Sequence, residues 1–260
     1  MNSYSAIQVD KREGVGYLRL DRPEVRNAFN QTMIDEILDA LGRIDKDEAI
    51  RVLIITGNGK AFQAGADIAE LKRMTPMEIL RWNNGIVMIN QGLETLRQPV
   101  IAAINGPAMG GGLELALSCT LRVMDPSAVV GLPEVKLGII PGTGGTQRLP
   151  RLIGKGRAAQ MLLTGAFMGA EEALHTGLVN YVAEAGDAVG EAERLAAKIM
   201  ANAPIAVEMA KDALEVGKDL PLAQAVLYSQ KNCVACFSTD DMQEGMSAFL
   251  EKRNANFTGK

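Results

Sequence analysis

Alternating strand and helix signals in the first half of this 260-residue chain constrain its fold more than any other feature. Residues 7–9 and 15–20 alternate like paired strands, and 27–30 then opens a segment with the apolar period of a helix. Strand-like runs follow at 51–56 and 99–104, and glycine-containing turns come after them. This order predicts an α/β fold on a parallel sheet, with functional loops at the strand ends.

Helical signals dominate after Gly142. Earlier in the chain we expect a short helix after Asp67 and a longer one at 76–97. The later helices are expected at 146–153, 156–164, 170–176, 187–203, 205–216, 222–237 and 240–252. This shift predicts a core domain at 1–195 that holds the functional site and a helical C-terminal region at 196–260.

Composition excludes several functional classes. The chain has 27 Lys and Arg against 31 Asp and Glu, a net charge of -4 and a pI near 5.3. With no basic block, nothing attracts nucleic acid. No apolar run approaches the roughly 18 residues of a membrane helix, and the start lacks a charged n-region and an h-region. We therefore expect a cytoplasmic protein with neither a membrane nor a nucleic acid as partner.

The three cysteines, Cys119, Cys233 and Cys236, are too few and too scattered for a disulfide framework. His175 is the only histidine, so a zinc or redox site has few ligands available. The spacing of Cys233 and Cys236 favours two positions on one face of a helix, and we expect no metal site.

Two loops at predicted strand ends are rich in small residues. Gly110–Gly112 lies between a strand and a helix, where free N–H groups and the helix dipole favour an anionic oxygen. Ala64–Asp67 has the same position after its own strand. Together the loops could aim two N–H groups at one oxygen, as an oxyanion hole does. The alternatives are close packing for the glycines and helix capping for Asp67, which we favour for that residue.

Two glutamates stand in apolar, glycine-rich surroundings, where a carboxylate is costly unless it is paired or functional. Glu114 falls in the first turn of the helix after the glycines, so a capping role is its alternative. Glu134 follows Pro133, which predicts an extended position, and its alternative is a surface ion pair with Lys136. An acid, a base and backbone donors at one site would suit enolate chemistry.

Other catalytic motifs are absent from the sequence. Gly142-Thr143-Gly144-Gly145 matches neither a dinucleotide-binding fingerprint nor a phosphate loop, and there is no Gly-x-Ser-x-Gly or His-Glu-x-x-His. Hydride transfer, nucleotide hydrolysis and serine hydrolysis are therefore disfavoured.

Four segments, in order, resemble the crotonase (enoyl-CoA hydratase) superfamily: 64–68, 105–114, 132–149 and 249–253. The similarity extends over nearly the whole chain. It implies a crotonase-like spiral of ββα turns followed by a helical C-terminal trimerisation region. The resemblance also implies a homo-oligomer, either a trimer or a dimer of trimers.

The resemblance implies a role for each matching residue. The N–H groups of Ala66 and Gly111 would hold the thioester oxygen. Glu114 would deprotonate the attacking water, Glu134 would exchange a proton at the α carbon, and the Gly142 N–H would help to place the water. The implied reaction is reversible syn addition of water to a trans-2-enoyl-CoA, giving a 3-hydroxyacyl-CoA in fatty-acid or related acyl-CoA breakdown. No cofactor is implied, because CoA is part of the substrate.

Binding of CoA is also implied by resemblance. The matching positions in one subunit are Lys60, Ala64, Ala66, Asp67 and Ile68, and those expected from a neighbouring subunit are Phe249 and Lys252. Leu132 departs from well-known short-chain hydratases, which carry a polar residue there. Acyl-chain preference is expected to depend on residues near 74–84.

Three other functions stay open. Another lyase of the superfamily, for example one working as a dehydratase, would use the same groups. An enoyl-CoA isomerase would need a proton shuttle but no water, so incorporation of water separates these readings. Some relatives bind RNA, which the acidic pI disfavours here.

Overall fold

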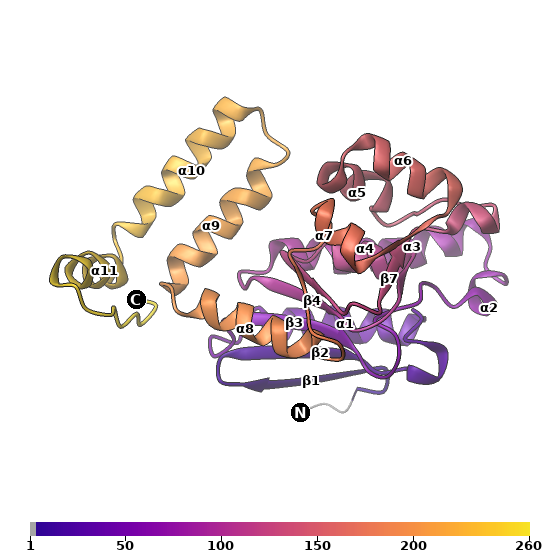
Figure 1. Ribbon diagram of the computed structural model, residues 1–260, viewed down its shortest axis with the longest axis horizontal. Coiled ribbons are helices and arrows are strands. Elements are labelled where there is room, and N and C mark those ends of the chain that lie inside the picture. The colour runs from indigo at the N-terminus through magenta and orange to yellow at the C-terminus, as the bar shows by residue number, and fades with distance from the viewer. Residues whose placement is uncertain (1–3) are drawn as a thin grey trace.

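A six-stranded sheet forms the centre of the protein in the computed structural model, which describes residues 4–260 (Figure 1). Its strands, in spatial order, are β1 (Ile7–Arg12), β2 (Val15–Leu20), β3 (Val52–Gly57), β4 (Val100–Ile104), β6 (Leu121–Met124) and β9 (Tyr181–Val182). In this sheet β2, β3, β4, β6 and β9 run parallel, as predicted, whereas β1 is antiparallel to β2. Positive φ angles at Glu13 and Gly14 make the tight hairpin that reverses the chain, so the sheet is mixed.

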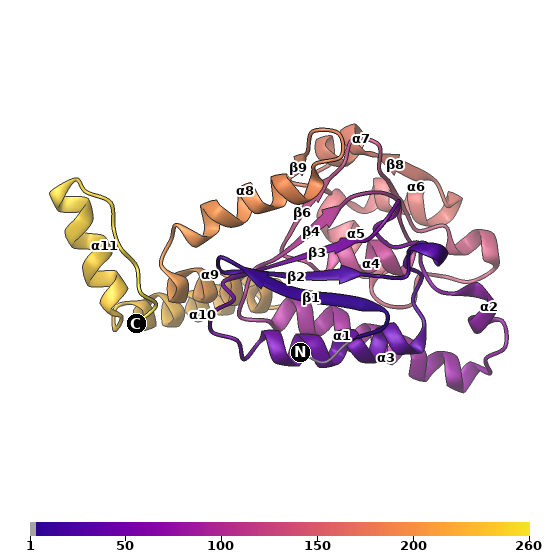
Figure 2. The same ribbon diagram turned by 90° about the horizontal axis from the view of Figure 1, so that it is seen from below.

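Helices cover both faces of this sheet (Figure 2). Against one face lie α1 (Gln31–Ile44) and α3 (Pro76–Thr95), and against the other lies α8 (Ala188–Met200). The alternation of side chains along β3 explains this arrangement, because Leu53 and Ile55 join one apolar cluster whereas Val52 and Ile54 join the other.

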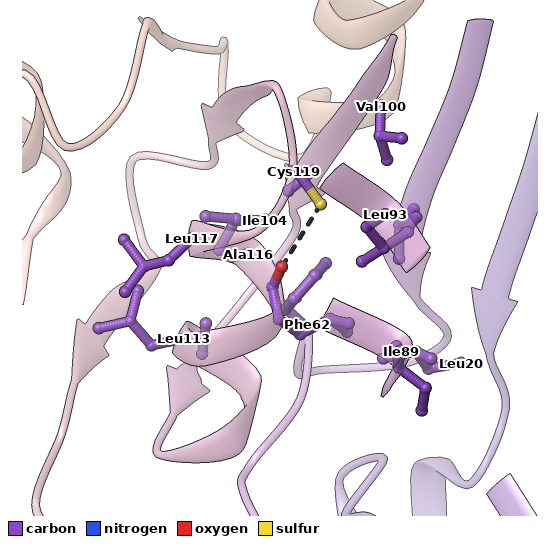
Figure 3. Close-up of a cluster of buried hydrophobic side chains, with 14 of the residues drawn as sticks. Leu20, Phe62, Ile89, Leu93, Val100, Ile104, Leu113, Ala116, Leu117 and Cys119 are labelled. Atoms are coloured by element: carbon purple, nitrogen blue, oxygen red, sulfur yellow. Dashed lines mark hydrogen bonds between the residues drawn. The ribbon is translucent and has the colours of Figure 1, made fainter. Parts of the chain in front are cut away.

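A second, smaller sheet combines β5 (Ala108–Met109), β7 (Val129–Gly131) and β8 (Phe167–Gly169). Strands of two or three residues carry too little periodicity to be found in the sequence. The helix α4 (Gly111–Leu117) follows β5 directly and is buried over nearly its whole length. Figure 3 shows its Leu113, Ala116 and Leu117 among core side chains from other elements, including Phe62 and Leu93. This packing fixes the position of Glu114 on α4.

Shorter helices lie between these elements along the chain. These are η1 (Pro23–Val25), α2 (Ile68–Leu71), η2 (Glu134–Leu137), α5 (Gly145–Ile153), α6 (Lys155–Thr164) and α7 (Ala170–His175). The predicted helices at 146–153, 156–164 and 170–176 thus correspond to α5, α6 and α7.

The C-terminal helices are α9 (Pro204–Gly217), α10 (Leu222–Cys236) and α11 (Asp240–Glu251). The pair α9 and α10 forms a hairpin that projects from the sheet, with α11 beyond it (Figure 1). The predicted boundary between residues 195 and 196 falls inside α8, a helix that packs on the sheet. The division into two domains therefore stays a prediction.

Cys233 and Cys236 both lie on α10, and Cys119 is a buried free thiol after α4. Within residues 4–260 no cluster of three or more His, Cys, Asp or Glu side chains could hold a metal ion. Over the same residues, no helix combines the length and apolar character that crossing a bilayer would require.

Candidate active site

Glu114 is almost fully buried, with 2% of its surface exposed, and its carboxylate has three hydrogen-bond donors. Its Oε1 accepts from the backbone N–H groups of Thr143 (2.9 Å) and Gly145 (2.7 Å), and its Oε2 accepts from the Thr143 hydroxyl. A Cβ at Gly145 would lie 3.1 Å from Glu114 Cγ and 2.8 Å from Leu132, which explains a glycine there. The carboxylate points to this loop, so Glu114 does not cap its own helix.

Glu134 has a different environment. It begins the 3-10 helix η2, so the predicted extended position is wrong: a proline restricts the residue before it, Leu132 here, rather than the residue after it. Its Oε2 is buried and has no hydrogen-bond partner among residues 4–260. Burial raises the pKa of Glu134 to about 7, and the nearby charge of Glu114 adds to the shift.

The surface ion pair between Glu134 and Lys136 does not form. Within the described chain no salt bridge joins these residues, and the Lys136 ammonium lies 4.9 Å from the ring centre of Phe167. A half-buried glutamate with a raised pKa and no cation partner is typical of a group that transfers protons.

The two small-residue loops meet beside Glu134. A Cβ on Gly110, whose φ is +54°, would lie 2.9 Å from Glu134 Oε1 and 3.8 Å from Gly65 Cα. A Cβ on Gly65 would lie 3.2 Å from the Met109 carbonyl. Only glycine therefore allows the loops to approach the carboxylate and each other this closely.

Hydrogen bonds hold the 64–67 loop in place and leave one donor free. The Gln63 amide both donates to the Gly65 carbonyl (2.9 Å) and accepts from the Gly65 N–H (2.7 Å). Phe29 bridges the same loop through its own N–H and carbonyl. No hydrogen bond between residues 4 and 260 uses the N–H of Ala66 or of Gly111. Both predicted donors are thus available, and Gln63 is a supporting residue that sequence reasoning missed.

Gly142 lies exposed at the start of the loop that binds Glu114. The amide of Asn83 on α3 packs against it, since a Cβ on Gly142 would be 2.9 Å from Asn83 Nδ2. Asn83 belongs to the 74–84 segment that was expected to influence acyl preference. No signal in the sequence paired Asn83 with Gly142, which is far away along the chain.

A cavity of about 480 Å³ opens beside the 64–67 loop. The residues that line it include Arg22, Asn30, Asp67, Ala69, Arg73 and Met74. The Asp67 side chain accepts from the Ala69 N–H (3.2 Å), which confirms its capping role. Lys60 and Ile68 are exposed, and Ala64 is half-buried.

Phe249 and Lys252 are not brought to this site within one subunit. They lie at the end of α11, at the opposite end of the molecule from α2 in both views (Figures 1 and 2). Phe249 is 82% exposed. Their contribution to CoA binding from a neighbouring subunit therefore stays a prediction.

Comparison with known proteins shows to which family this chain belongs. The profile of the family described as Enoyl-CoA hydratase/isomerase matches residues 10–260. The crotonyl-CoA hydratase of Syntrophomonas wolfei is 42% identical over 259 residues, which are 99% of this chain and 100% of that protein. The chain belongs to the enoyl-CoA hydratase/isomerase family.

Further relatives agree with this assignment. The short-chain-enoyl-CoA hydratase of Clostridium acetobutylicum is 42% identical over 248 residues, 95% of each chain. The crystal structure of the enoyl-CoA hydratase from Bacillus anthracis superposes with a TM-score of 0.95 at 40% identity and covers 98% of this chain and 100% of that one. The predicted crotonase fold is therefore confirmed, with two mixed sheets and C-terminal helices.

Proposed function

We propose that this protein catalyses the reversible syn addition of water to a trans-2-enoyl-CoA. By homology the chain is an enoyl-CoA hydratase, a hydro-lyase. The main support for this mechanism is that the two glutamates of the site have different environments. Glu114 accepts three hydrogen bonds, whereas Glu134 has a buried oxygen without a partner and a pKa raised to about 7 by burial. Different environments suit two carboxyl groups to opposite roles as base and acid.

In the proposed reaction the thioester oxygen accepts hydrogen bonds from the Ala66 and Gly111 N–H groups. Glu114 takes a proton from water as the oxygen adds to the β carbon, and protonated Glu134 gives its proton to the α carbon. The Gly142 N–H helps to place the water. Negative charge grows on the thioester oxygen during addition, and each donor there typically contributes about 3 to 4 kcal/mol.

The CoA portion is proposed to lie along Lys60, Ala64, Ala66, Asp67 and Ile68. The neighbouring cavity and the exposed positions of Lys60 and Ile68 support this placement. The proposed chemistry needs only proton transfers and backbone donors, so it requires no cofactor beyond the CoA of the substrate. A cytoplasmic location stays a prediction.

The direct test is to mix the purified protein with crotonyl-CoA and follow the absorbance of the conjugated thioester. We expect rapid loss of absorbance with 3-hydroxybutyryl-CoA as the product. Tight thioester binding without loss of absorbance would contradict hydration of this substrate and favour an isomerase or another acyl group.

An isomerase is the second candidate, because the matching family contains both activities and a relative from Mycosarcoma maydis is named an enoyl-CoA isomerase/hydratase. Moving a double bond needs one proton shuttle, for which Glu134 alone would serve. The buried, three-donor site around Glu114 favours hydration instead, since a second positioned carboxylate is needed to activate water.

The activity should depend on the proton that Glu134 holds. Hydration starts with Glu134 protonated and Glu114 ionised, and dehydration starts with the opposite arrangement. Both directions therefore need a single proton shared between the two glutamates. Because burial raises the pKa of Glu134 to about 7, kcat/KM in both directions should fall about tenfold per pH unit above that value. Rates measured from pH 5 to 9 check this, and a flat profile from pH 6 to 9 would contradict it.

A homo-oligomer, either a trimer or a dimer of trimers, is part of the proposal. Large apolar side chains of α10, of α11 and of the turn between them are exposed in the single chain, among them Leu222, Leu227, Val234, Phe237, Phe249 and Leu250. Apolar patches of this kind mark contact surfaces. Sedimentation should give three or six times the chain mass of 27.8 kDa. A monomer at micromolar concentration would contradict the proposal.

A further inference from the structure

Thr143 connects the Glu114 carboxylate to the loop that surrounds it. Only 4% of Thr143 is exposed, and both its N–H and its hydroxyl donate to Glu114. Its carbonyl accepts from Asn90 Nδ2 (3.0 Å) and from Arg148 Nη1 (3.2 Å). Every polar group of this residue is therefore used, and two of them meet the same carboxylate.

The residues behind Thr143 form a charged support. Arg148 pairs with both carboxylate oxygens of Glu94, at 2.7 Å and 3.1 Å, and Lys218 lies 3.0 Å from Glu94. A cavity of about 520 Å³ borders the loop on this side and is lined by Thr143, Arg148 and Glu94. On this side the loop is held by the hydrogen bonds that the Thr143 carbonyl accepts from Asn90 and Arg148.

The acceptor positions of the Glu114 carboxylate show what the Thr143 hydroxyl contributes to its orientation. A carboxylate oxygen has two acceptor positions. On Oε1 both are taken, by the Thr143 and Gly145 N–H groups. On Oε2 the Thr143 hydroxyl takes one, which leaves a single free position on the carboxylate. The two backbone bonds fix only Oε1, so the hydroxyl fixes Oε2 and with it the plane of the carboxylate.

We propose that Thr143 is a positioning residue whose hydroxyl aims the one free acceptor position of Glu114 at the attacking water. This inference rests on the proposed hydration and adds a side chain to it. Thr143 acts through Glu114, so its loss should slow the step in which water is deprotonated. Transfer of a proton at the α carbon, which is proposed for Glu134, should not depend on it.

The test compares Thr143→Val, which keeps the shape but loses the hydroxyl, with Thr143→Ser, which keeps the hydroxyl. For crotonyl-CoA hydration, kcat of Thr143→Val should fall about 10- to 100-fold, the usual effect of one hydrogen bond to a charged group. KM should stay unchanged, and Thr143→Ser should retain most of the activity. Thr146→Val, on the same segment but without a contact to Glu114, is the matched control and should behave like the unmutated protein.

A second readout separates positioning from structural damage. Exchange of the α protons of butyryl-CoA in ²H₂O needs Glu134 and the oxyanion donors but no attacking water, so Thr143→Val should exchange at the unmutated rate. Equal losses of hydration and exchange would overturn the positioning role, and so would unimpaired hydration in Thr143→Val. If the unmutated protein failed to hydrate any enoyl-CoA, the proposed function itself would fall.

Discussion

Glu114→Gln is expected to lower kcat/KM for crotonyl-CoA hydration by about 100- to 10,000-fold, the range for a positioned general base. The amide cannot take a proton from water at neutral pH. It does fit the site: its oxygen can still accept from the Thr143 and Gly145 N–H groups, and its NH₂ can donate to the Thr143 hydroxyl. The loss should therefore reflect chemistry, and circular dichroism should report an unchanged fold.

The control for Glu114→Gln is α-proton exchange of butyryl-CoA in ²H₂O, followed by NMR. Glu134 and the N–H groups of Ala66 and Gly111 remain in this variant, so exchange should continue near the unmutated rate. Hydration close to the unmutated rate would show that Glu114 is not the base. Loss of both activities would assign it a structural role.

Glu134→Gln is expected to slow both reactions, with hydration and α-proton exchange each reduced by about 100- to 10,000-fold. The carboxyl group of Glu134 lies against the turn that carries Gly110, where the α carbon is proposed to lie. Its pKa, raised to about 7 by burial, allows it to hold and release a proton near neutral pH. Measured rates for both reactions check this, and exchange that survives in the variant would contradict the role.

Thermal stability is the control for Glu134→Gln. Burial raises the pKa of Glu134 in the folded protein above its ordinary value of 4.5, so the folded state binds this proton more tightly than the unfolded state. The carboxyl group therefore makes the protein less stable as pH rises from that value towards about 7. A neutral amide avoids this cost, and the melting temperature of the variant at pH 9 should not fall below that of the unmutated protein.

Periodicity carried the prediction of the main elements. The central strand 51–56 and the long helix at 76–97 are close to the observed β3 and α3, because runs of that length repeat their pattern several times. The strands β5, β7 and β8 were not predicted, because two or three residues are too few to repeat a pattern. Antiparallel β1 was expected only as a paired strand, since its direction depends on the turn at Glu13 and Gly14.

Local chemistry identified the parts of the candidate site, but tertiary contacts decide how they work. Glu114 stood out because a carboxylate was unexpected in an apolar helix. Its partners lie 29 and 31 positions further along the chain, in a segment where the sequence analysis gave Thr143 no role of its own. The roles of Gln63 and Asn83 depend equally on loops folding beside them, and no spacing in the sequence reports that.

Glu114 and Glu134 are proposed to add water across a conjugated thioester from one face. Conversion of crotonyl-CoA in ²H₂O, with the product analysed by NMR, tests it most directly. We predict 3-hydroxybutyryl-CoA with one deuterium at the α carbon, on the same face as the new hydroxyl group. A product with the deuterium on the opposite face, or a shifted double bond without a hydroxyl group, would contradict syn hydration by these two residues.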